Sequence, residues 1–467
     1  MKKSCLLYLL LALLFFGCKG STELVITNVN IIDVQSGLVI ENQYILISDD
    51  LIIEHAAMDA YAGSIENGLD DRGMYVSPGL TDGDIYAGKN INDVKLWDTH
   101  FCDRLIARGV TTVRLTGSYY RIYEMLTDYG TIAGKDTIGP NFIESVVANY
   151  SLGNNIEGLN ELYESGNAAF IKVLANIPEE QLSNIMRYAD ENGIYICGNL
   201  FNFGDFQRVS GQGFDELASI RLLPLMLLDD EYADDINWFD MKESYAKLEQ
   251  YFSAYYGFTD EELIDQFGTR LTAAAALMKE HDIAVTTNLS VDQLWAMKAD
   301  HPERYLEYAE ANGVPSYYLL FLDEKVAGDS FRVENYPEQL SFQYRIDLLA
   351  LQILKEKGIK LIAGSFQFHN CMYGQAPGIS LHEELRLLVE AGYSDLEALK
   401  SATSVPSAIS EDSSLGFSYG RIEEGCIADL VFTSGNPLED ISVLREPDMV
   451  IKSGLVYDSL LLKTLRE

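Results

Sequence analysis

The feature that most limits the possible folds is an alternation of short apolar runs with stretches of helical periodicity. The runs are rich in valine and isoleucine, as buried strands are. They cover residues 108–114, 142–148, 169–175, 194–197, 214–217, 283–287 and 359–363. Between two of them, apolar residues recur at helical spacing from Leu182 to Ala189, with Pro178 at the predicted helix start and Gly193 at its end. Since parallel strands are joined by helical crossovers, this alternation predicts a (β/α)8 TIM barrel.

Both ends of the chain have a different pattern, that of strands separated by glycine turns. The predicted strands lie within residues 24–33, 44–48, 420–432 and 450–457. The 467 residues are too many for one small domain and suit a large barrel with a satellite domain. We therefore expect a composite β-sandwich domain from residues 23–76 and 416–460, and a barrel from residues 77–415.

Residues 221–345 depart from the simple alternation, and we expect a helical insertion there. Thr259 to Glu262 form a capping box before a helix whose leucines and phenylalanine share one face. The run 229–235 is strongly acidic, and aromatic residues cluster over 245–258. The simpler interpretation of these aromatics is the core of the insertion, and the alternative is a wall that stacks on a ligand.

Motifs along the predicted barrel resemble the metal-dependent amidohydrolase superfamily, in its imidazolonepropionase- and prolidase-like branch. Residues 77–86 read Ser-Pro-Gly-Leu-Thr-Asp-Gly-Asp-Ile-Tyr, where that family has Pro-Gly-Leu-Ile-Asp-x-His-x-His at its first barrel strand. Residues 420–431 match the family pattern Gly-x-Ile-x-x-Gly-x-x-Ala-Asp-Leu-Val. The resemblance spans residues 23–458. It implies the barrel with a β-sandwich, divalent metals at the carboxyl ends of the strands, and hydrolysis of C–N bonds. It also leaves a homodimer open, since many relatives dimerise.

At nearly every position where the family holds its metals, this chain has another residue. The two histidines after the first strand correspond to Asp84 and Tyr86. The histidines of the fifth and sixth strands correspond to Asn199 and Ser219. The aspartate of the eighth strand, which ligates a metal and accepts a proton from water, corresponds to Phe366. Of these, only Asp84 has a side chain that divalent ions favour.

Lys172 is the one metal-site residue that the resemblance retains. In the family this lysine bridges two metals as a carbamate. Without metals nothing stabilises the carbamate, so we expect a free ammonium group. Opposite charges a few ångströms apart favour both charged forms. We therefore expect Lys172 to pair with Asp84 across the barrel mouth, hydrogen-bonded to Tyr86 and Asn199.

Retained strand motifs and lost ligands together predict a pseudoenzyme without a metal or another cofactor. It would bind a small polar ligand, or a protein partner, and it has no assigned catalytic residue. The residues expected to line its pocket are Asp84, Tyr86, Lys172, Asn199, Ser219 and Phe366.

Two alternatives stay open. An active hydrolase of amide or peptide-like bonds would need a rebuilt site with one zinc or other divalent ion. In that site the catalytic candidates are Asp84 and His369, or Asp84 with Asp82, although Asp82 matches a structural position that caps the strand end. His369 is the one histidine predicted to reach the mouth, and Cys371 follows it closely. The other alternative is an interaction protein that binds its partner through the acidic insertion at residues 221–345.

The first residues resemble a bacterial lipoprotein signal. Lys2 and Lys3 precede an apolar run that is too short to span a bilayer, and the run ends at Phe-Phe-Gly-Cys. This pattern predicts a signal peptide over residues 1–17, lipidation of Cys18 and a tether over residues 18–22. We therefore expect attachment to a membrane through acylated Cys18, in the bacterial cell envelope on the extracytoplasmic side.

Composition excludes some functions. The formal net charge of −37 disfavours nucleic acid and anionic lipid headgroups as partners. Beyond the signal, Cys102, Cys197, Cys371 and Cys426 are widely spaced and form neither a zinc motif nor a readable disulfide framework.

Overall fold

In the computed structural model, the strands belong to two separate sheets, one of them closed into a barrel. The structure describes residues 23–63, 68–86, 101–116, 139–148, 160, 168–174, 177–237, 240–312, 329–368, 375–409 and 417–466.

The barrel sheet is parallel throughout and its strands follow chain order. The strands are β6 (Leu80–Tyr86), β7 (Val110–Leu115), β8 (Asn141–Ala148), β9 (Phe170–Val173), β10 (Ile196–Gly198), β11 (Glu216–Leu217) and β12 (Ala284–Thr286). The last pass is made by two short pieces, β13 (Leu361–Ile362) and β14 (Gln367–Phe368). β13 pairs with β12 and β14 pairs with β6, so this pass closes the ring. The predicted (β/α)8 barrel is therefore confirmed.

Side chains alternate across the barrel wall, and the interior is partly polar. On β7, Val113 and Leu115 pack outward into the large core between strands and helices. Arg114 lies between them in sequence and faces inward, where its guanidinium is 4.9 Å from the Phe170 ring centroid and 2.6 Å from the Glu216 carboxylate. All of these side chains are buried. The two charges must therefore stay paired, because an isolated buried charge is costly.

The second sheet combines both ends of the chain, as expected. Its order is β17 (Leu455–Tyr457), β16 (Met449–Lys452), β15 (Leu430–Thr433), β5 (Tyr75–Pro78), β1 (Glu23–Asp33), β2 (Leu38–Ser48) and β3 (Leu51–Ala57), with β4 (Leu69–Asp70) beside β1. β5 is the seam, since it pairs with β1 in parallel and with β15 antiparallel. This domain has its own apolar core, separate from that of the barrel.

The predicted helix signals have their expected positions. α6 (Glu179–Asn192) starts after Pro178 and ends at Gly193, whose left-handed backbone (φ 60°) suits glycine. α10 (Asp260–Glu280) starts with a complete capping box between Thr259 and Glu262. The other α-helices are α3 (Phe101–Ala107), α7 (Phe203–Ser210), α8 (Asp230–Asp234), α9 (Met241–Phe252), α11 (Leu289–Asp300), α12 (Pro302–Ala311), α14 (Asp329–Asn335), α15 (Pro337–Lys357), α16 (Ile379–Glu390), α17 (Asp395–Ser401) and α19 (Ser459–Arg466).

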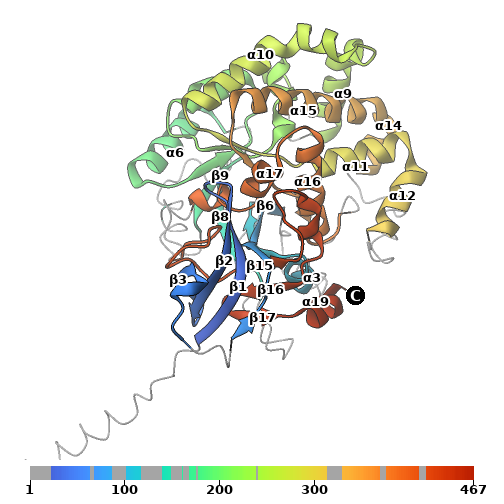
Figure 1. The fold of residues 1–467 in the computed structure, drawn as a ribbon. Coiled ribbons are helices and arrows are strands. Elements are labelled where there is room, and N and C mark those ends of the chain that lie inside the picture. The colour runs from blue at the N-terminus through green and yellow to red at the C-terminus, as the bar shows by residue number, and fades with distance from the viewer. Residues whose placement is uncertain are drawn as a thin grey trace, which may run out of the picture.

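The region 221–345 contains α8, α9, α10, α11, α12, α14, the first part of α15, and strand β12. Its aromatic rings pack on one another, with Phe252 5.4 Å from Phe342 and Tyr255 4.9 Å from Phe267 between ring centroids. These rings form part of the large core, which agrees with the simpler interpretation of the aromatic cluster. In Figure 1, α10 lies on the opposite side of the molecule from the terminal strands β1 to β3.

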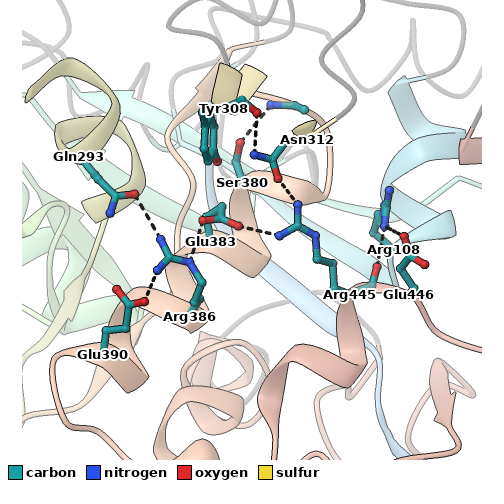
Figure 2. Close-up of polar contacts among 11 residues, drawn as sticks. Arg108, Gln293, Tyr308, Asn312, Ser380, Glu383, Arg386, Glu390, Arg445 and Glu446 are labelled. Carbon is teal, nitrogen blue, oxygen red and sulfur yellow. Dashed lines mark hydrogen bonds and ion pairs between the residues drawn. The ribbon is translucent and has the colours of Figure 1, made fainter. Parts of the chain in front are cut away.

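A network of charged side chains ties the C-terminal segment to the barrel helices. Figure 2 shows Glu383 of α16 between two arginines, with Arg386 Nε at 2.9 Å and Arg445 Nη1 at 2.8 Å. Arg445 also donates to Asn312 at the end of α12, and its own carbonyl accepts from Arg108 at 2.9 Å. The side chain of Glu383 is 4% exposed, so this carboxylate depends on its two cations.

The structure describes only some of the residues behind the predictions for the start of the chain and for the cysteines. The signal peptide, Cys18 and the tether lie outside the described residues. Within the described ranges, no helix is both long and apolar enough to cross a membrane. Cys102, Cys197 and Cys426 are free thiols, and Cys371 is not among the described residues.

Candidate functional site

The carboxylate of Asp84 is the centre of the predicted site. It lies near the carboxyl end of β6 and is 1% exposed. Lys172 Nζ lies 3.9 Å from Asp84 Oδ1, and Thr116 Oγ1 donates to the same oxygen. Asn288 Nδ2 donates to the other oxygen, Oδ2, at 3.1 Å. Both oxygens of this carboxylate are thus engaged by groups of the protein itself.

The pairing of Lys172 with Asp84 was expected and is confirmed. Lys172 is on β9, faces the barrel interior and is 2% exposed. The hydrogen-bond donors to Asp84 differ from the expectation, since they are Thr116 and Asn288 in place of Tyr86 and Asn199. Thr116 directly follows β7, and Asn288 lies just beyond β12. Polar residues immediately after buried strands were the signal that would have identified them.

Tyr86 and Phe366 meet at the barrel mouth. Their ring centroids are 6.2 Å apart at an interplanar angle of 59°. Phe366 has a left-handed backbone (φ 50°), which is strained for a large side chain and places its ring where the chain turns between β13 and β14. The guanidinium of Arg221 lies over the same ring at 5.2 Å.

Ser219 and Asn199 have separate positions. The Ser219 hydroxyl accepts a hydrogen bond from the backbone of Arg221 at 3.3 Å and so caps a short 3-10 helix. Asn199 follows β10 and lines a cavity whose walls do not include Asp84. The structure therefore joins Asp84 with Lys172 and Tyr86 with Phe366, while Ser219 and Asn199 have other contacts.

Asp82 has the structural role that the resemblance implied. It accepts hydrogen bonds from the backbone and hydroxyl of Ser365, at 2.9 and 2.6 Å, and so ties β6 to the last pass of the barrel. Burial raises the pKa of Asp82 to about 7, although the bonds from Ser365 oppose this shift.

A cluster that the sequence did not suggest lies beside the mouth. Arg221 Nε is 2.9 Å from the buried carboxylate of Asp292, and its guanidinium is 4.6 Å from the Trp295 ring centroid. Burial raises the pKa of Asp292, which Arg221 opposes. Burial and the Asp292 charge together raise the pKa of Asp347. Repulsion between these two buried carboxyls therefore favours the protonated form of Asp347.

The fold is similar to the folds of several solved structures. A Xaa-Pro dipeptidase with bound methionine aligns with 94% of this chain and 100% of its own, at 18% identity and a TM-score of 0.61. Bottromycin amidohydrolase aligns with 94% of this chain and 88% of its own, at 16% identity and a TM-score of 0.63. Ochratoxinase from A. niger aligns with 94% of this chain and 96% of its own, at 16% identity and a TM-score of 0.60. The chain has the amidohydrolase fold. No protein-family model and no curated protein matches the sequence.

Around Asp84 in this fold, the side chains that the structure describes do not fit a divalent ion. Over the described ranges, no group of three or more histidine, cysteine, aspartate or glutamate side chains could hold one. Asp84 is a single carboxylate, and the ammonium of Lys172 would repel a cation placed beside it. The buried His382 is elsewhere: its Nε2 lies 2.8 Å from the carbonyl of Arg108, and burial lowers its pKa to about 3. His369 and Cys371 lie outside the described residues.

Proposed function

We propose that this protein is a metal-free pseudoenzyme, a binding protein built on the amidohydrolase fold. The observation that carries the proposal is the engagement of Asp84. Lys172, Thr116 and Asn288 together engage both of its carboxylate oxygens, so the one ligand-type side chain at the metal positions has partners within the chain.

Electrostatics supports the same proposal. A divalent ion at Asp84 would have to displace the Lys172 ammonium, a charge that is 3% exposed and would lose its carboxylate partner. A deprotonated or carbamylated Lys172 would remove this repulsion. Each of those forms would then require the metal to be present to offset the lost pairing with Asp84.

The bound molecule would be a small polar ligand or a protein partner at the carboxyl ends of the barrel strands. Barrel proteins bind their ligands at this end because the strand termini and the loops converge there. Asp84, Tyr86, Lys172 and Phe366 would form the floor, and Asn199 would face a cavity at one side.

A second candidate function is hydrolysis of C–N bonds at a rebuilt mononuclear site. Its support is that the similar structures named above include a Xaa-Pro dipeptidase and an amidohydrolase. For this chain it would require Asp84 to exchange its internal partners for a metal ion.

Metal content separates the two functions. We would purify the chain from residue 19 onward, incubate it with zinc and manganese, remove free ions, and measure bound metal by elemental mass spectrometry. The pseudoenzyme predicts far less than one equivalent, unchanged by Asp84→Ala. One or two equivalents, lost in Asp84→Ala and retained in the control Asp282→Ala at an exposed ion pair, would support the hydrolase instead.

We also propose that the mature protein is anchored in the bacterial cell envelope through acylated Cys18. The support is the residue pattern before Cys18, with two lysines and then an apolar run. Labelling cells with a radioactive fatty acid tests it. Cys18→Ser would abolish labelling and release the protein from membranes, whereas the control Cys5→Ser, inside the predicted signal, would leave both unchanged. Labelling that survives Cys18→Ser would contradict the anchor.

A further inference from the structure

A cavity of 270 Å³ lies at the carboxyl ends of β9 and β10, beside the barrel mouth. A cavity of this volume holds several water molecules, so it suits a small molecule. Neither Asp84 nor Lys172 lines it. The cavity is therefore separate from the pair of Asp84 and Lys172, and Asn199 forms part of its wall.

One side of the cavity is apolar. Val173 ends β9, Leu182 comes from α6, Leu200 follows β10, and Ala233 and Ile236 come from α8 and the turn after it. These side chains belong to the large core and are at most 5% exposed. A ligand with a hydrocarbon body would be favoured here, because its apolar surface would leave water.

The other side of the cavity is polar and is organised by Asn202. The Asn202 side-chain oxygen accepts the backbone N–H of Asp205 at 2.6 Å, which caps α7. Its side-chain nitrogen donates to Asp205 at 3.1 Å and to Asp234 at 3.2 Å. This one amide therefore holds two carboxylates in place at the edge of the cavity.

The carboxylates at this edge exceed the cations that offset them. Arg208 pairs with Asp205 at 2.5 Å and also with Glu179 at 2.7 Å, so one guanidinium serves two carboxylates. Over the described residues, Asp234 has no cationic partner within ion-pair distance. Burial raises the pKa of Asp205, as does the nearby Asp234 charge. A further cation between these carboxylates would relieve that repulsion.

We infer that this cavity binds a small primary ammonium compound with an apolar body. Its ammonium group lies between Asp205 and Asp234, where the charge is in excess. Its hydrocarbon part lies against Val173, Leu182 and Leu200. This inference deepens the proposed function, on which it rests, because it gives the chemical class of the small ligand.

Three probes with the same apolar body test the inference by isothermal titration calorimetry. They are 2-phenylethylammonium, the neutral 2-phenylethanol and the anion 3-phenylpropanoate. The cavity predicts that the ammonium binds at least tenfold more tightly than the alcohol and that the anion does not bind. Asp234→Asn should weaken ammonium binding at least fivefold. The matched control is Asp235→Asn, since Asp235 is adjacent and exposed, pairs with Lys247 and does not line the cavity.

Equal binding of alcohol and ammonium, or equal loss of affinity in the two variants, would overturn the inference. Thermal unfolding of both variants checks that each is folded, and Asp234 is exposed, so its replacement leaves the core intact. Metal content is measured on the same samples. Metal-free protein that does not bind the ammonium compound would contradict the ligand inference but not the pseudoenzyme. Metal-loaded protein that binds the compound would contradict the pseudoenzyme but not the ligand inference.

Discussion

Lys172 Nζ lies 3.9 Å from Asp84 Oδ1 inside the barrel, and both side chains are at most 3% exposed. The two residues come from β9 and β6, which are not neighbours in the sheet. The pair therefore spans the interior of the barrel near the carboxyl ends of its strands. The positive charge beside Asp84 is the ammonium of Lys172, a side chain of the protein itself.

Breaking this pair is expected to destabilise the protein strongly. Lys172→Met leaves Asp84 buried without a cation, which costs about 3–5 kcal/mol of unfolding free energy. Adding Asp84→Asn to Lys172→Met should recover most of the loss. Urea denaturation measures both. The control Lys360→Met breaks a shorter but exposed pair with Asp282, at 2.6 Å, and should cost less than about 1 kcal/mol. Similar losses for Lys172→Met and Lys360→Met would contradict a buried pair.

Asp82 is expected to make the protein less stable as the pH rises from about 4 to 7. Its pKa is raised from 3.8 to about 7 by burial, so the folded state retains a proton that the unfolded state releases. Unfolding therefore becomes more favourable across this window, by up to about 4 kcal/mol from this group. Asp82→Asn should flatten the dependence between pH 5 and 7 in urea titrations. An unchanged slope in the variant would assign the pH effect to other groups.

Glu383 is expected to hold the C-terminal segment against the barrel. Glu383→Ala leaves Arg386 and Arg445 facing a buried gap and should cost about 3 kcal/mol, with faster amide hydrogen exchange over residues 441–446. Glu390→Ala removes another partner of Arg386. The Glu390 side chain is 60% exposed, so this change should cost less than about 1 kcal/mol. Exchange that rises equally in both variants would argue against this role.

Gly364 is expected to tolerate no side chain. A Cβ there would lie 2.6 Å from Thr286 Cγ2 and 2.9 Å from the Asp84 Cβ, so Gly364→Ala would push on the strand that carries Asp84. We expect a loss of about 1–3 kcal/mol by thermal unfolding. Gly257→Ala is the control, because a Cβ there has nothing within 4 Å and the change should stay near zero. A neutral Gly364→Ala would mean that the last pass of the barrel can move freely.

Much of the architecture could be predicted from local patterns. Apolar runs of strand length and the termini of α6 and α10 identify their elements, because side-chain periodicity and capping act within a few residues. The last barrel strand was less predictable. The run 359–363 is a single apolar stretch in the sequence, whereas the structure divides this pass into β13 and β14 around Phe366. The turn depends on a left-handed backbone at a phenylalanine, which no local preference favours.

The candidate site, too, could be predicted only in part from the sequence. The opposite charges of Asp84 and Lys172 follow from the sequence, and their place at metal positions is what the family resemblance implies. The lipid anchor and the ligand remain predictions. The contacts of Thr116 and Asn288 with Asp84, and of Arg221 with Asp292, depend on distant strands and helices being brought together.

By itself, the sequence determined the order of strands and helices and the union of both chain ends in one domain. Tertiary structure alone decided which groups pair with or donate hydrogen bonds to the carboxylate of Asp84, and where a cavity remains. The physical reason is that hydrogen bonds, ion pairs and voids depend on positions to within an ångström. Those positions are set by the packing of β6, β9, β10 and β12 with the helices around them, far apart along the chain.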